Sequence, residues 1–436
     1  MSPKPSFQSE LFDVEPSPRV VSASPAGKVR TEEPERRQGE IRFEMPEDAL
    51  PVSHPARLIW AVLETLDLSA FGADSKAVEG RAGRSVKCPR MMLTLWMYAI
   101  SRGIGSAREI ARLIKTEASF FWIVGNVDVS HHKLSAFRAS QSAAFDKLMT
   151  DVLASLMCKG LLSLEMVAED GTRTRASASA PSFRKEESLQ QCKEQAELHL
   201  KAVLSDADNA EHSRAQHARR EAAARDFKSR VDAAIQTVQA LQAERSPSDK
   251  APRASTTDHE ARVMKMGDGG FRPAYNVRYA VAGSPLGGPR TIVGVMVDNV
   301  GSDMGAITPM VDQVHERTGS RPNTILADGG FAKHEDIASA MKQGVDVIVP
   351  PGERAKPLEK LGDVAPEVRA WRERMEADDA KKLYKARAGL CELANAHQKG
   401  TQALTQVLVR GAVKVTNVVL LGAISANILA HASKLL

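Results

Sequence analysis

The sequence predicts an α/β protein, a mixed sheet with helices on its faces, preceded by an all-α segment. Two patterns indicate this fold class. Apolar residues recur at helical spacing between His54 and Leu156, and from Leu162 onward short apolar runs of strand type alternate with helical segments. Strands that alternate with helices are typical of a sheet covered by helices. With 436 residues, of which 43% are hydrophobic, the chain is long enough for two or three domains.

The N-terminal part is expected to contain two regions of different character. Residues 1–45 are rich in Ser, Pro and charges of both signs and have few large apolar residues, so we expect a disordered leader. Residues 46–158 are expected to form a helical domain, because their apolar stripes fit several short helices that pack together.

Two predicted helices in that domain, Ser106–Leu113 and Ser130–Arg138, begin at serine N-caps. Their arrangement is similar to a helix-turn-helix, whose second helix would present His131, Lys133 and Arg138 to DNA. A plain helical bundle with a polar outer face also explains these residues, so both interpretations stay open.

The sheet is predicted in residues 159–436. An apolar run, Leu164–Ala168, leads to Asp170-Gly171, and because Asp-Gly is a common hairpin turn, we expect Thr172–Ala176 to be the second strand of a hairpin. Four further strands are predicted at Phe271–Val281, Thr291–Val297, Thr324–Ala327 and Val345–Val349. Helices are predicted at Met304–Arg317, at Glu335–Gln343 and over most of residues 366–436.

A helical insertion is expected to interrupt the sheet at about residues 183–263. The first part of this segment, Phe183–Glu244, is rich in Ala, Glu, Gln, Lys and Arg and contains neither Gly nor Pro. This composition is typical of long exposed helices and favours an antiparallel helical spacer.

The charge is distributed unevenly. The whole chain has a net charge of +5, whereas the segment from Lys381 to the C-terminus has eight Lys or Arg and one acid, Glu392. A carboxylate within a basic surface suits a metal ion that is bound against a polyanion. The four cysteines form no CxxC pair and no apolar segment follows the start Met, so we expect a cytoplasmic protein. The apolar run Val418–Ala432 is shorter than a membrane span and is predicted to be a buried helix.

Three acids are candidate metal ligands. Asp170 and Asp328 each follow an apolar strand and precede glycine, and side chains at strand ends project into an open crevice in α/β sheets. Together with Glu392 from a packed helix, they would form a set of three carboxylates without His or Cys, which favours two Mg²⁺ or Mn²⁺ ions. Such ions promote phosphoryl transfer on nucleic acid. Other acids near strand ends compete for this role, namely Asp268, Asp298 and Asp303.

Three further side chains lie one or more helical turns from Glu392, namely Tyr384, Arg387 and Lys399. We expect them to bind DNA phosphates, orient the strand that is cut and offset the charge of the transition state. A solvated helix face is the plain alternative for Arg387 and Lys399.

With these residues, the chain resembles the DDE transposases of bacterial insertion sequences, specifically the group with a Tyr-Arg-Glu-Lys signature. The signature stands here as Tyr384-x2-Arg387-x4-Glu392-x6-Lys399, with four residues between Arg and Glu where the broad superfamily has three. The other motifs that carry the resemblance are Val78–Arg84, Gly103–Glu109, Ala168–Thr172, Phe271–Asn276 and Asp328–Phe331.

The resemblance implies that the helical domain of residues 46–158 binds DNA. It also implies a ribonuclease-H-like catalytic fold, with Asp170 on the first strand, Asp328 after the fourth and Glu392 on the following helix. It also implies a transposase that binds the terminal inverted repeats of double-stranded DNA, cuts the 3′ ends by hydrolysis and joins them to target DNA. We expect a homodimer in the DNA complex, associated with the nucleoid when bound and with no membrane partner. Two alternatives stay open: a ribonuclease-H-like nuclease without strand transfer, and a catalytically inactive DNA-binding protein.

Overall fold

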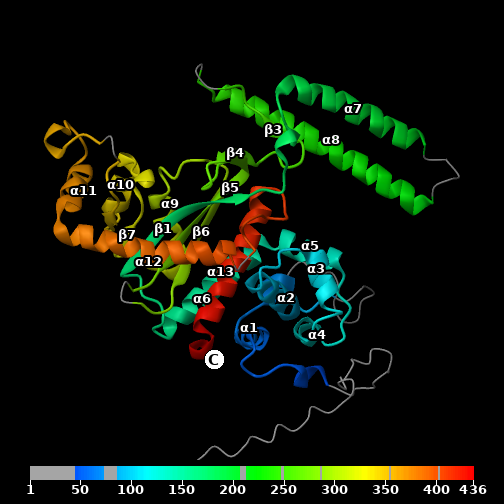
Figure 1. Ribbon diagram of the computed structural model, residues 1–436, viewed down its shortest axis with the longest axis horizontal. Coiled ribbons are helices and arrows are strands. Elements are labelled where there is room, and N and C mark those ends of the chain that lie inside the picture. Colours follow the sequence, from blue (N-terminus) through cyan, green and yellow to red (C-terminus); the bar gives the residue numbers. More distant parts are fainter. Residues whose placement is uncertain are drawn as a thin grey trace, which may run out of the picture. The chain divides into compact units, whose positions relative to one another are not determined.

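A computed structural model describes residues 45–72, 86–206, 213–246, 250–284, 287–352, 355–400 and 403–436 (Figure 1). The predicted leader therefore lies outside the described residues except for Met45, and so does the motif at 78–84.

The sheet is mixed, as the sequence predicts, and its central strand order is β6-β5-β1-β7-β8, with β4 beside the first part of β5. Its strands are β1 (Met166–Arg175), β4 (Arg262–Lys265), β5 (Phe271–Ala282), β6 (Thr291–Asp298), β7 (Thr324–Leu326) and β8 (Asp346–Ile348). β5 is antiparallel to β1 and β6, whereas β7 is parallel to both β1 and β8. The four strands predicted after the insertion are confirmed as β5 to β8.

The predicted hairpin turn at Asp170-Gly171 is wrong, because both residues lie inside the continuous strand β1. Asp170 pairs with Tyr279 of β5, and Gly171 pairs with Arg278. The long strand β5 therefore provides partners on both sides of the Asp-Gly pair, and the extended ladder satisfies backbone groups that a turn would otherwise use.

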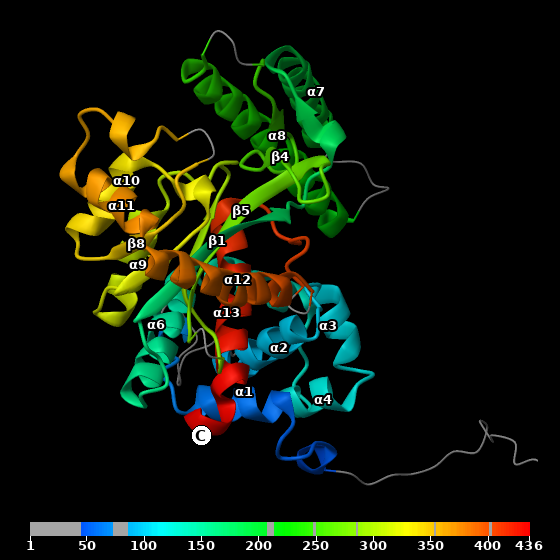
Figure 2. The same ribbon diagram turned by 60° about the vertical axis from the view of Figure 1, so that its left-hand side comes forward.

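Helices cover both faces of the sheet (Figures 1 and 2). One face is covered by α12 (Asp378–Gly400), whose Leu390 and Cys391 pack on Ala168 of β1 and Leu326 of β7. Three helices cover the other face of β7 and β8, namely α9 (Ile307–Thr318), α10 (His334–Lys342) and α11 (Pro366–Glu376). Alternate residues of β7 and β8 thus pack on opposite helical layers, as expected for strands buried on both sides.

The helical segment before the sheet consists of α1 (Pro55–Glu64), α2 (Pro89–Ser101), α3 (Ala107–Leu113), α4 (Ala118–Val124), α5 (His131–Ser140) and α6 (Ser142–Cys158). α4 separates α3 from α5, so the two helices predicted to form a helix-turn-helix are not consecutive. Arg138 is buried, its Nη1 donates to the Gly105 carbonyl at 2.6 Å, and its guanidinium lies 4.5 Å from the Trp96 ring centroid. Of the two open interpretations, the one in which Arg138 faces DNA is therefore wrong, because this buried side chain holds the helices together.

The C-terminal helix α13 (Ala412–Leu435) packs on α1, α2, α5, α6 and β6, so it joins the helical segment to the sheet. It is long and apolar enough to cross a membrane by composition, but most of that stretch is buried inside the protein, which confirms the predicted buried helix. The Asn427 side chain accepts from the amide of Ile292 and donates to its carbonyl, both at 2.8 Å. α13 thereby satisfies the backbone N–H and C=O groups of Ile292 at the edge of β6, which hinders pairing of that edge with another chain. The hydrophobic core runs without interruption from the N-terminal helices through α13 to β5 and β6.

The insertion contains the helices α7 (Glu186–Ser205) and α8 (Arg214–Ala243), which pack on each other through a small apolar cluster of their own. Two short strands, β2 (Phe183–Arg184) and β3 (Ala254–Ser255), pair at the base of this helical hairpin. The two long helices lie within the segment that the sequence predicts as a helical insertion.

Candidate active site

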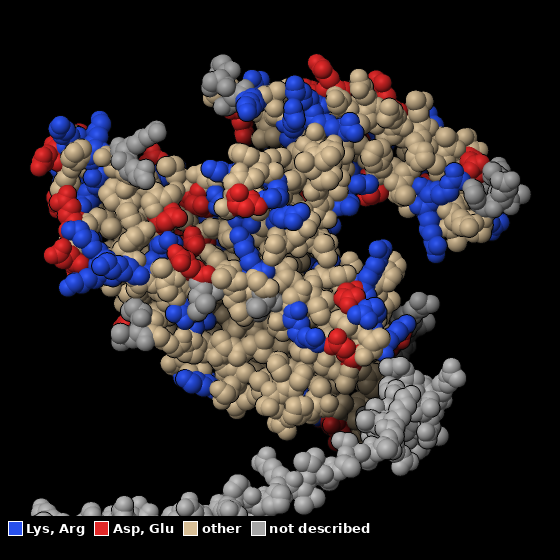
Figure 3. Space-filling model, viewed as in Figure 1, with Lys and Arg blue, Asp and Glu red and all other residues tan. Residues whose placement is uncertain are grey.

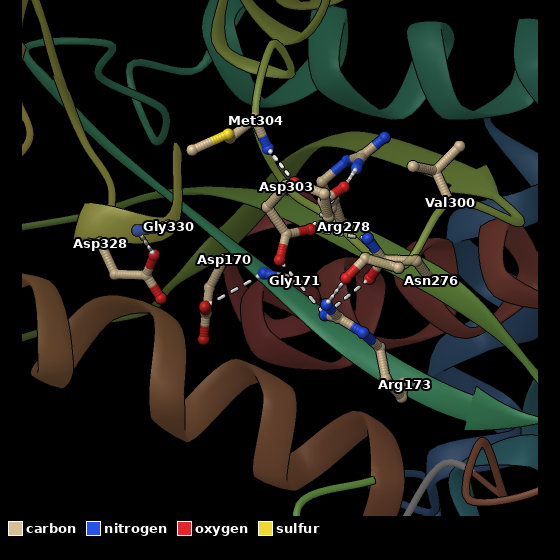
Figure 4. A network of polar contacts seen from close by, with 12 residues as sticks. Asp170, Gly171, Arg173, Asn276, Arg278, Val300, Asp303, Met304, Asp328 and Gly330 are labelled. Carbon is tan, nitrogen blue, oxygen red and sulfur yellow. Dashed lines mark hydrogen bonds and ion pairs between the residues drawn. The ribbon is translucent and has the colours of Figure 1, made fainter. Parts of the chain in front are cut away.

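The register of two parallel strands brings Asp170 and Asp328 together. Ala168 of β1 pairs with Leu326 of β7, and each aspartate lies two residues further along its own strand direction. Because side chains alternate along a strand, both aspartates project to the same face as Ala168 and Leu326, the face that α12 covers. Figure 4 shows the two carboxylates close to each other and directed toward α12.

Each carboxylate oxygen of Asp170 accepts a hydrogen bond. Its Oδ2 accepts from Asn395 Nδ2 of α12 at 2.8 Å and its Oδ1 from the amide of Gly171 at 3.0 Å. Burial raises the pKa of Asp170, and repulsion from Asp328 raises it further, while Arg387 and the two hydrogen bonds oppose the shift. A divalent cation between the two aspartates would relieve this repulsion.

Asp328 is fixed by its own loop. Its Oδ1 accepts from the amide of Gly330 at 2.7 Å, which caps the short 3-10 helix Gly329–Phe331 after β7. The hydrogen bond orients the carboxylate, and among the described residues no ion pair with Asp328 is present.

Arg387 lies between the carboxylates of the site. Its Nη1 is 3.7 Å from Asp170 Oδ1, and its Nη2 is 3.8 Å from Glu392 Oε1. Burial is the largest single influence and disfavours its charge, but the attractions of Asp170, Tyr384, Cys391 and Asp328 together outweigh burial, so the pKa of Arg387 is raised. The arginine therefore stays charged and neutralises part of the acidic cluster.

Glu392 is placed on α12 as predicted, but its side chain is 65% exposed and faces Arg387. Among the residues that the structure describes, no group of three or more His, Cys, Asp or Glu side chains is arranged to hold a metal ion. Asp170 and Asp328 are thus brought together, whereas Glu392 does not join them in this conformation.

Each of the three competing acids forms an ion pair with an arginine. Asp298 forms an ion pair with Arg278, and Asp303 accepts from Asn276 at 2.6 Å and from Arg173 at 3.2 Å (Figure 4). The third, Asp268, pairs with Arg272 at 2.7 Å in the turn between β4 and β5. These pairs leave Asp170 and Asp328 as the better candidates for metal ligands.

The Asp303 network also explains why position 171 is glycine. A Cβ atom at Gly171 would lie 2.5 Å from Asp303 Oδ1, closer than van der Waals contact allows. The carboxylate of Asp303 occupies the space beside the strand, and it ties the loop between β6 and α9 to β1, directly next to Asp170.

The other two predicted DNA-binding residues lie on α12 near the pair of aspartates. The Arg387 guanidinium is 5.9 Å from the ring centroid of Tyr384, so the ring supports the arginine. Lys399 is half-buried, and burial together with the charge of Arg173 lowers its pKa, while Asp170 opposes the shift. No ion pair involving Lys399 is present in the described part of the chain.

Asn395 was missed by reasoning from the sequence. The helical repeat puts Arg387, Cys391, Asn395 and Lys399 on one stripe of α12, each four residues from the next, and this stripe faces Asp170. Glu392 is one residue away from the stripe, which turns it by about 100° toward solvent. The sequence signal that could have identified Asn395 is its spacing from Arg387, which puts both residues on the same face of a helix. The Asn395 Oδ1 atom is buried and has no hydrogen-bond partner among the described residues.

The fold and the site define an α/β protein with paired carboxylates and an arginine at the crevice of its sheet, an arrangement suited to phosphoryl transfer. Residues 44–140 match the family model described as Transposase domain (DUF772). This match supports a transposase, and the matched segment contains α1 to α5 and none of the sheet. No curated protein and no solved structure matches the chain.

Proposed function

We propose that the chain is a DDE-type transposase with a ribonuclease-H-like catalytic sheet, which cuts the 3′ ends of its element and joins them to target DNA. The observation that carries the proposal is the matched position of Asp170 in β1 and Asp328 just after the neighbouring parallel strand β7, both facing α12. The family match supports the coarse class independently, since it lies in a different part of the chain.

The strand order supports the catalytic fold. Three antiparallel strands in chain order, β1, β5 and β6, are followed by two strands that run parallel to β1 on its other side. The resemblance implies the same placement, with the first aspartate on the first strand and the second after the fourth of these strands. α12, which carries Glu392, follows the fifth.

The donor set fits Mg²⁺ or Mn²⁺. Asp170 and Asp328 offer carboxylate oxygens, and the buried Oδ1 of Asn395 is a further oxygen that has no hydrogen-bond partner among the described residues. In our proposal, Asp170, Asp328 and Glu392 hold the ions, and the exposed Glu392 side chain rotates away from Arg387 when DNA and metal bind. When bound, two ions supply Lewis-acid activation of the attacking hydroxyl and stabilise the leaving oxygen.

The other residues position the substrate. Arg387 stays charged beside Asp170 and is placed to offset negative charge that develops on the scissile phosphate. Tyr384 holds the guanidinium in place, and Lys399 attracts the phosphate backbone from the far end of the same stripe. Two element ends have to be cut together, so we propose that two copies of the chain assemble on the DNA.

A cleavage assay on the DNA that flanks the reading frame tests the proposal. Wild-type protein with Mg²⁺ should cut the terminal repeats at their 3′ ends, and Asp170→Asn and Asp328→Asn should each lower the rate by at least about 100-fold. Asp226→Asn, an equal charge change on the exposed face of α8, should leave the rate unchanged. Binding without cutting by the wild type would sink the enzymatic proposal and favour an inactive DNA-binding protein.

The same assay distinguishes the nuclease alternative. When a labelled, pre-cut element end is supplied with a target plasmid, a transposase should join the two, whereas a nuclease should only cut. Glu392→Gln should abolish both steps. If Glu392→Gln cuts as fast as the wild type, Glu392 is not a ligand and the exposed position seen in the structure is its working position.

A further inference from the structure

A cavity of about 610 Å³ adjoins the candidate active site on the side of Gly171, the residue after Asp170. The described residues that line it include four basic side chains and no acidic one; the four are Arg173, Arg262, Lys265 and Lys399. Asp170 is therefore next in sequence to a residue that lines a groove whose described charged side chains are all basic. Such a groove attracts a polyanion.

Two of the four cations are already paired within the protein. Arg173 contacts Asp303 and donates to the Gly301 carbonyl at 2.7 Å, and the Arg262 guanidinium donates to three backbone carbonyls of residues 259–261. Lys265 and Lys399 have no ion pair in the part of the chain that the structure describes. These two lysines, one on β4 and one on α12, are the charges that remain for a ligand.

The hairpin of β4 and β5 forms one wall of the groove. Lys265 pairs directly with Phe271 across this hairpin, so the two side chains lie on the same face as cross-strand neighbours. The Phe271 side chain is exposed, at 68%, and so is that of Val263 on the same face. Figure 3 shows Lys and Arg side chains over the region of β4 and β5, with Asp and Glu side chains between them. Exposure of one phenylalanine alone indicates nothing, but its position beside an unpaired lysine at a basic groove is typical of a site that binds a phosphate and the adjoining base.

We propose that this groove holds the DNA strand next to the scissile phosphate, with the β4–β5 hairpin as a clamp: Lys265 and Lys399 contact backbone phosphates and Phe271 stacks on a base. This inference rests on the proposed function and extends it, because it assigns DNA contacts to a hairpin outside α12. The groove volume and the absence of acidic side chains along its described lining fit a phosphodiester chain better than an isolated anion.

Binding measured without metal separates this inference from catalysis. Fluorescence anisotropy of full-length protein in EDTA would use a mixed-sequence DNA single strand of about 20 nucleotides and its duplex, at about 50 to 300 mM salt. Lys265→Gln and Lys399→Gln should each flatten the slope of log K against log salt by about 0.7 on the single strand. Lys201→Gln, at an exposed position of α7, should not change the slope.

Stacking by Phe271 has its own readout. Phe271→Ala should weaken binding of the single strand by about tenfold and abolish quenching of a 2-aminopurine base in it, and Phe271→Trp should restore both. Leu198→Ala, which removes an equally exposed apolar side chain from α7, is the matched control and should behave as wild type.

The outcomes are distinguishable. If the wild type binds no DNA, the proposed function itself fails. If the wild type binds DNA but Lys265→Gln and Phe271→Ala bind it as the wild type does, the hairpin is not a clamp. The same conclusion follows if the two α7 control variants lose as much affinity as the two hairpin variants. Either result overturns only this inference. Equal melting temperatures of the variants show that the fold is intact in each comparison.

Discussion

Replacing Gly171 with alanine should displace Asp303 and loosen the strand that carries Asp170. An ideal Cβ at position 171 lies 2.5 Å from Oδ1 and 2.8 Å from Cγ of Asp303, whereas non-bonded heavy atoms pack at about 3.5 Å. The strand cannot yield, because Gly171 is paired with Arg278 in the middle of the β1–β5 ladder. The Asp303 carboxylate must therefore move by about 1 Å.

The magnitude follows from the contacts that this movement breaks. The Asp303 side chain is 14% exposed, and it accepts from Asn276 Nδ2 at 2.6 Å, Arg173 Nη1 at 3.2 Å and Arg278 Nη1 at 3.4 Å. A hydrogen bond to a charged group contributes about 1.5 to 3 kcal/mol, and partial access to water replaces some of the loss. We expect Gly171→Ala to lower the free energy of unfolding by about 2 to 4 kcal/mol.

Urea unfolding followed by circular dichroism measures this change. Gly267→Ala is the control, because a Cβ at that nearby glycine meets nothing within 4 Å. Asp303→Ala alone should also destabilise, since it leaves Arg173 and Arg278 without their shared carboxylate, but it removes the obstacle to a Cβ at position 171. The double variant should therefore be more stable than the sum of the two single effects predicts. Additive effects, or a Gly171→Ala variant as stable as the wild type, would refute the reasoning.

Three further changes have defined outcomes. Asn395→Ala removes the donor to Asp170 Oδ2, so the affinity for Mn²⁺, titrated by electron paramagnetic resonance, should fall by about tenfold or more; unchanged affinity would mean that Asn395 does not orient the ligand. Arg138→Ala removes a buried guanidinium and should lower the free energy of unfolding by about 3 kcal/mol in urea titrations, whereas a surface DNA-reading arginine would leave stability unchanged. Burial and nearby Lys434 lower the pKa of His431 below 6.5, so the unfolded chain takes up a proton that the folded chain resists. The free energy of unfolding should fall as the pH drops from 6.5 toward the lowered pKa, by at most about 1.4 kcal/mol per pH unit. His431→Gln should not show this part of the pH dependence when stability is measured between about pH 5 and pH 8.

A second acid of β1, Glu169, lies next to the site in surroundings that are unfavourable for a carboxylate. Glu169 lies on the opposite face of β1 from Asp170, is fully buried, and neither of its carboxylate oxygens has a hydrogen-bond partner among the described residues. Burial, opposed by the charge of Arg278, holds the pKa of Glu169 well above its usual range. Alternation along one strand therefore gives two adjacent acids different environments, since Asp170 has polar partners on α12 and Glu169 has none.

Strand and helix positions after residue 270 could be predicted because their apolar periodicity is local. The runs Thr291–Val297 and Val345–Val349 became β6 and β8 with shifts of at most two residues at their ends. The Asp-Gly pair misled the prediction for β1, because a dipeptide that favours a turn in isolation is overruled by a continuous antiparallel partner.

The sequence by itself determined the mixed α/β class, the helical insertion, the buried C-terminal helix and two acids at equivalent places after apolar runs, since these depend on composition and on the spacing of neighbouring residues. The tertiary structure decided which side chains meet. The parallel register of β1 and β7 put Asp170 beside Asp328, and the rotation of α12 turned Asn395 toward that pair and Glu392 toward solvent. The tertiary structure also joined α13 to the N-terminal helices. Strand register and helix rotation depend on contacts between segments far apart in the chain, and the spacing of neighbouring residues does not encode them.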